Sequence, residues 1–278
     1  MNAKLPQRLL LGLLILALML FSLTPIIWQF LTSVKTNAEI AAIPAVYWPK
    51  QWTLEHYQSL FNRRPIGAYL FNSGLIAIVS TLLSLGLGAP AAYGLARFRF
   101  QGQSLVLGAI SLVILFPYIF LFLGLLELVK ALGLGNNYLA LIIPYTAINL
   151  PLAILVLRSF FHQIPIEIEE AARLDGYRTL ALIWYIVLPL ALPALVTTGI
   201  LSFIFAWNEY LLALTFMTRE TMKTIPVATA AIAGSSIFEI PYGPMAAATV
   251  LATFPLVLLV LFFQRRIVQG LTAGAVKG

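Results

Sequence analysis

The sequence predicts an all-α integral membrane protein with six transmembrane helices and both termini in the cytoplasm. Hydrophobic residues make up 61% of the 278 residues and charged residues only 10%, whereas soluble domains have roughly 45–50% and about 25%. Six apolar stretches reach the length of about 20 residues that crosses the ~30 Å hydrocarbon core of a bilayer. A water-soluble fold has no interior large enough for this much apolar surface.

The first apolar stretch follows Lys4 and Arg8, as the core of a signal peptide does. It is longer than the roughly 7–15 residues of such a core, and no small-residue cleavage site follows Ser22, so we expect a retained helix. Hydropathy then predicts five further spans. The six expected spans are Leu9–Leu31, Tyr69–Ala96, Leu105–Leu126, Tyr138–Leu157, Ile186–Phe205 and Met245–Phe263.

Basic residues orient these spans, because Lys and Arg are enriched in cytoplasmic loops. With the N-terminus inside, ten basic residues fall on the inner side and seven on the outer side. The inner group is Lys4, Arg8, Arg97, Arg99, Arg158, Arg173, Arg178, Arg265, Arg266 and Lys277, and the outer group is Lys35, Lys50, Arg63, Arg64, Lys130, Arg219 and Lys223.

No linker or low-complexity tract marks a second domain. We expect an N-terminal helix with a long outer loop over residues 1–68, a transmembrane domain over 69–264 and a cytoplasmic tail over 265–278. A short outer loop is expected near Lys130, and a second long outer loop over Phe216–Pro244. Tyr47, Trp48 and Trp52 in the first outer loop suit a position along the membrane surface.

Several classes of site are excluded by composition. The net charge of +7 is not gathered into basic clusters interleaved with aromatic residues, so no nucleic-acid partner is expected. Cys is absent, and His56 and His162 lack nearby carboxylates at metal-ligand spacing, so we expect no metal and surface or interfacial roles for both. No phosphate-binding Gly-x4-Gly-Lys-Ser/Thr loop occurs, so this chain is expected to bind no cofactor and not to hydrolyse ATP.

The most informative stretch is Gln163–Pro193, between the fourth and fifth expected spans. Pro165 followed by acidic residues predicts the start of a short helix, and Asp175-Gly176 predicts its end. A second helix follows from Thr179, with Pro189 and Pro193 where it meets the membrane. Either Ala171 and Ala172 leave room for a docking partner, or Ile164, Ile166 and Ile168 hold an amphipathic loop on the membrane surface.

A resemblance favours docking. Glu170-Ala171-Ala172, Gly176 three residues on, and Ile186-Val187-Leu188-Pro189 after nine more resemble the EAA-x3-G-x9-I-x-L-P signature of binding-protein-dependent ABC importer permeases. The resemblance implies the type I ABC importer permease fold, with a coupling helix in a loop over about residues 163–190 that sits in a cleft of the ATPase. The residues it implies for ATPase coupling are Glu169, Glu170, Ala171, Ala172, Arg173, Asp175, Gly176, Ile186, Leu188 and Pro189.

Further segments resemble the carbohydrate-type permeases, in particular the smaller permease subunit of maltose systems. These segments are AAYGLARFRFQG from Ala91, FAWNEYL from Phe205, and GLTAGAVKG from Gly270, a tail that in that subfamily also contacts the ATPase pair. The resemblance implies a bacterial inner-membrane location, alternating access, and four kinds of partner: an ATPase dimer carrying ATP and Mg²⁺, a second permease subunit, an extracytoplasmic solute-binding protein and membrane lipid.

Polar residues at membrane depth are candidates for the translocation path, because a charge there costs roughly 2.5–3.5 kcal/mol. These candidates are Asn149, Asn208 and Glu209; for Asn149, which lies close to Pro151, we favour a role in a helix kink. For Glu209 we favour contact with outer water or a neighbouring helix, because it lies near a helix end. Asn72 and Ser73 are expected to serve as the cap and packing surface of the second span, and Gly86 and Gly88 to allow close helix approach.

Three classes of function are compatible with a multi-pass membrane protein: an ABC permease subunit, a secondary transporter and a membrane enzyme. An ion-coupled secondary transporter, the main alternative, would show internal repeats and buried acids near the midplane, and neither is evident. A membrane enzyme would need a nucleophile with a base, or metal ligands, and the sequence has neither a Gly-x-Ser-x-Gly motif nor a pair of histidines at ligand spacing. The expected function is therefore a permease subunit for sugars or related polyhydroxy solutes. Its second outer loop is expected to touch the binding protein, through Ser235, Ser236, Ile237, Phe238 and Glu239.

Overall fold

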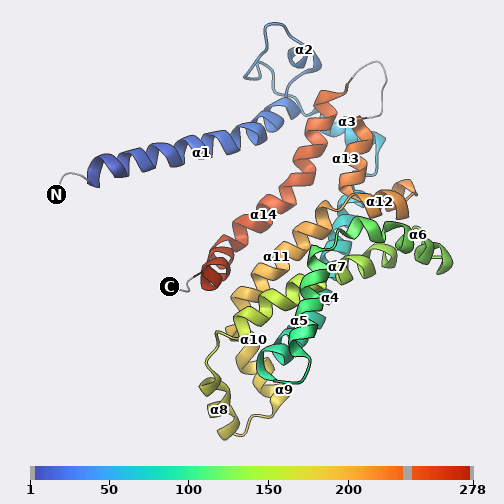
Figure 1. The fold of residues 1–278 in the computed structure, drawn as a ribbon. Coiled ribbons are helices and arrows are strands. Elements are labelled where there is room, and N and C mark those ends of the chain that lie inside the picture. The colour runs from blue at the N-terminus through green and yellow to red at the C-terminus, as the bar shows by residue number, and fades with distance from the viewer. Residues whose placement is uncertain (1–3, 234–239, 276–278) are drawn as a thin grey trace. The chain divides into compact units, whose positions relative to one another are not determined.

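The computed structural model describes residues 4–233 and 240–275, and every regular element within those ranges is helical (Figure 1). The chain divides into two compact units. One comprises Met1–Gly67 and Ala228–Phe254, and the other comprises Ala68–Val227 and Pro255–Gly278. The expected binding-protein contact over residues 235–239 lies outside the described residues.

The first half of the chain runs from a long N-terminal helix to the fourth apolar stretch. Its elements are α1 (Lys4–Ser33), α2 (Asn37–Ile40), α3 (Glu55–Arg63), α4 (Ile66–Arg97), α5 (Gln103–Leu115), the 3₁₀ helix η1 (Tyr118–Leu121), α6 (Phe122–Ala131) and α7 (Leu139–Phe161).

The second half alternates short and long helices. Its elements are α8 (Ile166–Leu174), α9 (Thr179–Leu182), the π-helical turn η2 (Ile183–Val187), α10 (Leu188–Leu190), α11 (Leu192–Asn208), α12 (Leu211–Phe216), the 3₁₀ turn η3 (Glu220–Met222), α13 (Ile225–Ala233) and α14 (Tyr242–Ala275). The last helix continues past the expected end of the membrane domain at residue 264.

Four to six segments of the described chain can cross a membrane. Four helices are long and apolar enough by themselves, over Leu9–Ser33, Ile66–Arg97, Leu139–Phe161 and Tyr242–Gln264. Two further segments qualify only as bent pairs, Gln103–Leu115 with Tyr118–Ala131 at 88° and Thr179–Leu190 with Leu192–Asn208 at 75°. The expected third and fifth spans are therefore not continuous helices.

Proline causes both breaks. Phe116 adopts an extended conformation directly before Pro117, as pre-proline residues tend to do, and this ends α5. In the fifth segment, Pro193 cannot donate a hydrogen bond to the carbonyl of Pro189, and the chain bends at Ala191 between α10 and α11. The bend in the fifth segment agrees with the expectation that Pro189 and Pro193 redirect the chain, whereas the break at Pro117 was not expected, because hydropathy averaged over a window does not respond to a single proline.

The unit that contains most of α4 is built around α7, which packs against α5 and α11. A Cβ at Gly88 would lie 3.2 Å from the Cβ of Ala153, and a Cβ at Gly199 would lie 3.1 Å from Leu85. Gly88 therefore allows α4 to approach α7 closely, as expected from the sequence. Gly86 has nothing within 4 Å of that position, so the expectation was wrong there.

The other unit contains α1 and the segment with α2 and α3 that follows it. Lys35 is only 2% exposed; its Nζ donates to the carbonyl of Val46 at 2.5 Å and lies 4.5 Å from the ring centre of Trp28. Burial lowers the pKa of the Lys35 ammonium, and the Coulombic attraction of Glu39 opposes that shift. His56 is buried beside Gly243, with Nε2 2.8 Å from the carbonyl of Lys35, which corrects the expected surface position.

Candidate functional site

Polar side chains gather at the two ends of α4, and the stretch between those ends is free of charged residues. Asn72 lies near the first end and Arg97 at the second. At 1.5 Å per residue, about 38 Å of helix separates them, slightly more than the ~30 Å hydrocarbon core. The two polar clusters therefore suit the two boundaries of a membrane.

At the second end of α4, a buried ion pair holds α8. The Arg97 Nε lies 2.6 Å from Glu169 Oε1, with side chains only 9% and 3% exposed. Tyr93 donates to Glu169 Oε2 at 2.7 Å, and Arg97 Nη2 donates to the carbonyl of Ile164 at 3.0 Å. We call Tyr93, Arg97 and Glu169 the α4–α8 clasp.

The boundaries of α8 follow from local chemistry. Pro165 occupies the N-cap position, one residue before the expected start, and Glu167 and Glu169 fill the first turn, where the helix dipole favours carboxylates. Gly176 ends the helical stretch with φ +88°, a conformation that favours glycine. The short helix and its stop signal are thus confirmed.

The two faces of α8 have different neighbours. Glu169 and Ala172, three residues apart, face inward and are 2% and 5% exposed. Ala172 joins an apolar cluster with Ile164 and Leu182. The outward face is exposed and consists of Ile166, Glu167, Ile168, Glu170, Ala171, Arg173 and Leu174.

This arrangement corrects two expectations about the segment. Ile164 is 7% exposed and packs in the protein interior, so it is not available to hold a loop on a membrane surface. Room for an approaching surface exists at Ala171 but not at Ala172, which is covered by its own chain. Exposed apolar side chains continue beyond α8, with Leu174 90% and Leu180 83% exposed.

The remaining signature residues lie after Gly176. Ile186 and Leu188 are half-buried and pack against the cluster around Leu182 and Val187. Pro189 lies in α10, immediately before the bend at Ala191. These positions therefore shape the return of the chain toward α11, whereas Glu170, Ala171 and Arg173 are free to contact another molecule.

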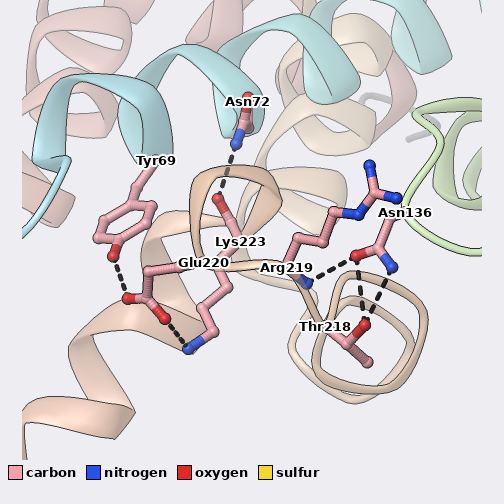
Figure 2. A network of polar contacts seen from close by, with 7 residues as sticks. All are labelled: Tyr69, Asn72, Asn136, Thr218, Arg219, Glu220 and Lys223. Carbon is pink, nitrogen blue, oxygen red and sulfur yellow. Dashed lines mark hydrogen bonds and ion pairs between the residues drawn. The ribbon is translucent and has the colours of Figure 1, made fainter.

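At the first end of α4, a polar network holds the segment Thr218–Lys223 (Figure 2). Asn72 donates through Nδ2 to the carbonyls of Thr221 and Lys223 at 2.9 and 3.0 Å, and Tyr138 donates to its Oδ1 at 2.8 Å. Tyr69 donates to the carboxylate of Glu220, which also accepts from Lys223 at 2.5 Å.

Asn136 fixes the start of the same segment. Its Oδ1 accepts from the backbone N–H of Arg219 at 2.7 Å, and its Nδ2 donates to the hydroxyl of Thr218 at 2.9 Å. Figure 2 places these contacts beside those of Glu220 and Lys223. Residues 218–221 are exposed, so the network presents an ordered polar surface.

The structure corrects the expected capping role of Asn72 and Ser73, whereas their expected packing role agrees with the exposure of only 2% for each. Because α4 begins at Ile66, both residues lie within the helix, and neither is at its N-cap. Asn72 instead binds the Thr218–Lys223 segment, and the Ser73 hydroxyl accepts from the backbone N–H of Ile225 at 2.8 Å. Ser73 thus binds the first residue of α13, a cap supplied by another helix.

Glu209 is buried and bonded within its own chain. It is 5% exposed, and its oxygens accept from the backbone N–H groups of Leu212 at 3.0 Å and Ala213 at 3.2 Å. The hydroxyl of Tyr145 donates to Glu209 Oε2 at 2.5 Å. Of the alternatives left open by the sequence, this geometry favours contact with a neighbouring helix, because Tyr145 lies on α7.

The other two translocation candidates bond to their own helices. Asn149 is buried and donates to the carbonyl of Tyr145 at 2.9 Å, whereas Asn208 is exposed and donates to Ile204 at 2.8 Å. The structure does not bring these residues together with Glu209 in one polar site. A translocation role for each of the three remains a prediction.

A family model described as "Binding-protein-dependent transport system inner membrane component" matches residues 84–273. The chain is 42% identical to the trehalose transport permease SugB of Mycobacterium tuberculosis, over 93% of each chain. It is 38% identical to the trehalose/maltose transport permease MalG of Thermococcus litoralis, over 100% of each. A bacterial ABC transporter that imports the polysaccharide alginate has a similar fold, with a TM-score of 0.81, 23% identity, and coverage of 95% and 98%.

Proposed function

The chain belongs to the family of binding-protein-dependent transport system inner membrane components, and we propose that it is a permease subunit of an ATP-driven importer of sugars or related polyhydroxy solutes. The named relatives transport trehalose or maltose, which supports this substrate class. Neither relative is described as ion-coupled, so the comparisons offer no support for a secondary transporter.

The observation that carries the proposal is the two-faced α8. Its inner face is fixed to α4, and its outer face exposes charged and apolar side chains, including Glu170 and Leu174. Exposed apolar groups rimmed by charges suit a protein interface. The EAA signature covers the same residues, so we assign the outer face of α8 to a separate ATPase subunit that carries ATP and Mg²⁺.

Six spans with both termini in the cytoplasm follow if each bent pair crosses the membrane once. The end of α4 that contacts α8 lies near Arg99, Arg158, Arg173 and Arg178, whereas the other end follows Arg63 and Arg64 and lies near Lys130, Arg219 and Lys223. Because these two groups are similar in size, the assignment of α8 to the cytoplasmic side of a bacterial inner membrane rests on the EAA signature and on the ten-to-seven excess of inner basic residues over the whole sequence. Thr218–Lys223 would then face outward, with a second permease and lipid around the spans.

The binding protein is assigned to the outward end of this unit. The ordered Thr218–Lys223 segment leads directly into α13, which ends just before the predicted contact over residues 235–239. Alternating access then requires only that ATP and the loaded binding protein bind the outward-facing state more tightly than the inward-facing state.

Reconstitution tests the proposal. The chain alone, and the chain with its cognate ATPase, second permease and binding protein, are placed in lipid vesicles and given radiolabelled trehalose or maltose. We expect uptake only from the full set and only with ATP. Uptake by the chain alone under an ion gradient would contradict the proposal, as would an Arg173→Cys variant that reacts with an impermeant maleimide from outside the cell.

A further inference from the structure

The α4–α8 clasp is a polar connection between helix α8, whose outer face is exposed, and the described remainder of its unit. Tyr93 and Arg97, both on the last turns of α4, bind Glu169, and α8 also packs against α9, where Leu182 shares an apolar cluster with Ala172. Covalently, α8 is joined through Pro165 on one side and through Gly176, with φ +88°, on the other. Neither connection continues a helix, so neither transmits a displacement rigidly.

The ion pair itself is suited to carrying a displacement. Arg97 and Glu169 are both buried, so the attraction between them is screened little by water. Arg97 also donates to the carbonyl of Ile164, just before α8. The ring of Tyr93 packs edge-on against the ring of Phe161, with 5.8 Å between the ring centroids. The clasp therefore fixes α8 in orientation as well as in distance.

The far end of α4 is hydrogen-bonded to another segment of the same unit. Asn72 and Tyr69 hold Thr218–Lys223 through three hydrogen bonds, about one membrane thickness from the clasp along a single continuous helix. A movement of α8 that displaced α4 along or around its axis would thus reach Thr218–Lys223 directly.

We propose that α4 is the connecting element between the two faces of this permease, and that Tyr93, Arg97 and Glu169 are positioning residues that pass movement of α8 to it. This inference rests on the proposed function, because it is the ATPase that would move α8. In this proposal Glu169 binds Arg97 and Tyr93 within the permease, whereas its exposed neighbours Glu170 and Arg173 remain available to bind the ATPase.

The direct test measures whether α8 and α4 move together. Because the native chain has no Cys, spin labels are placed at Arg173→Cys on α8 and Phe98→Cys beyond α4, both exposed, in a full complex that keeps ATP-dependent uptake after labelling, since Arg173 lies on the face assigned to the ATPase. We expect one distance distribution with and without ATP and vanadate. In Glu169→Gln we expect the two conditions to differ, by about 5 Å or more. An unchanged distribution in Glu169→Gln would overturn the proposal.

Transport gives an independent measurement. Glu169→Gln and Arg97→Gln should lower trehalose uptake per ATP roughly fivefold or more while ATP hydrolysis persists. Arg97→Glu combined with Glu169→Arg should restore part of the loss. The matched control is Glu127→Gln, which breaks an exposed ion pair with Lys130 and should change nothing.

If Glu169→Gln does not assemble, Tyr93→Phe removes only one hydrogen bond and should lower uptake per ATP; a normal ratio would overturn the proposal. Equal loss in the single variants and in the charge-reversed pair would also overturn it. A wild-type complex that showed no ATP-dependent uptake would instead contradict the proposed function, without bearing on the clasp.

Discussion

Replacing Glu209 should destabilise the membrane domain through the loss of a buried cap. The carboxylate accepts hydrogen bonds from two backbone N–H groups at the start of α12 and from the hydroxyl of Tyr145. In Glu209→Leu these three donors stay buried without an acceptor. At about 1–3 kcal/mol for each unsatisfied group, and with partial relaxation, the expected loss is about 3–6 kcal/mol.

A graded series separates this capping role from a general effect of substitution. Glu209→Gln keeps one acceptor oxygen and should cost about 1–2 kcal/mol, as should Tyr145→Phe. Asn208→Leu is the matched control, because Asn208 is exposed and bonds only to the carbonyl of Ile204 within its own helix. It should change the free energy of unfolding by less than about 0.5 kcal/mol.

The assay is the thermal unfolding midpoint of the assembled complex in detergent, followed by tryptophan fluorescence. For a chain of this size, 1 kcal/mol corresponds to roughly 2–4 °C, so Glu209→Leu should lower the midpoint by at least about 6 °C. The double variant of Tyr145→Phe and Glu209→Gln should lose less than the sum of the two single effects, because both remove one contact. A Glu209→Leu midpoint equal to that of the wild type, or strictly additive losses of stability in the double variant, would refute the reasoning.

A transport measurement separates the capping role from a role in translocation. If Glu209→Gln had normal stability but lost uptake, the result would favour a position of Glu209 in the translocation path.

Three further predictions follow from close contacts. Gly88→Val should cost about 1–3 kcal/mol of stability because its side chain meets Ala153, whereas Gly86→Val should cost far less; equal thermal midpoints would contradict this packing. Asn72→Leu should loosen the segment that it holds, seen as faster hydrogen exchange in residues 218–224, and unchanged exchange would count against the network. Gly176→Ala, strained at φ +88°, should lower uptake per ATP while leaving membrane insertion intact; wild-type coupling would argue against a strict geometry at the end of α8.

The sequence could predict what depends on local composition. Long apolar stretches identified four helices that can cross the membrane alone, because burial in lipid depends on summed hydrophobicity. Pro165 and Gly176 located α8 to within one residue, because capping acts through neighbouring backbone groups. The family resemblance, carried by the EAA signature, is confirmed by the family model over residues 84–273.

The sequence could not predict what depends on distant contacts. Glu169 and Glu170 are adjacent and chemically identical, yet only Glu169 faces Arg97, 72 residues away in the chain. Asn72 was misassigned as a cap because α4 begins directly after Pro65, earlier than hydropathy indicated. Glu209 is satisfied by Tyr145, 64 residues away, a partner that no local pattern announces.

The division of α8 into two faces implies that its sequence can be altered one face at a time. Substitutions confined to the outer positions, such as Glu170, Ala171 and Arg173, leave the inner positions Glu169 and Ala172 in place. Grafting the outer residues of a related importer onto this helix should therefore transfer the choice of motor subunit between systems while preserving the host fold. In chimeric transporters, the outer residues of this helix could therefore be exchanged to change the partner while the inner residues keep the helix in place.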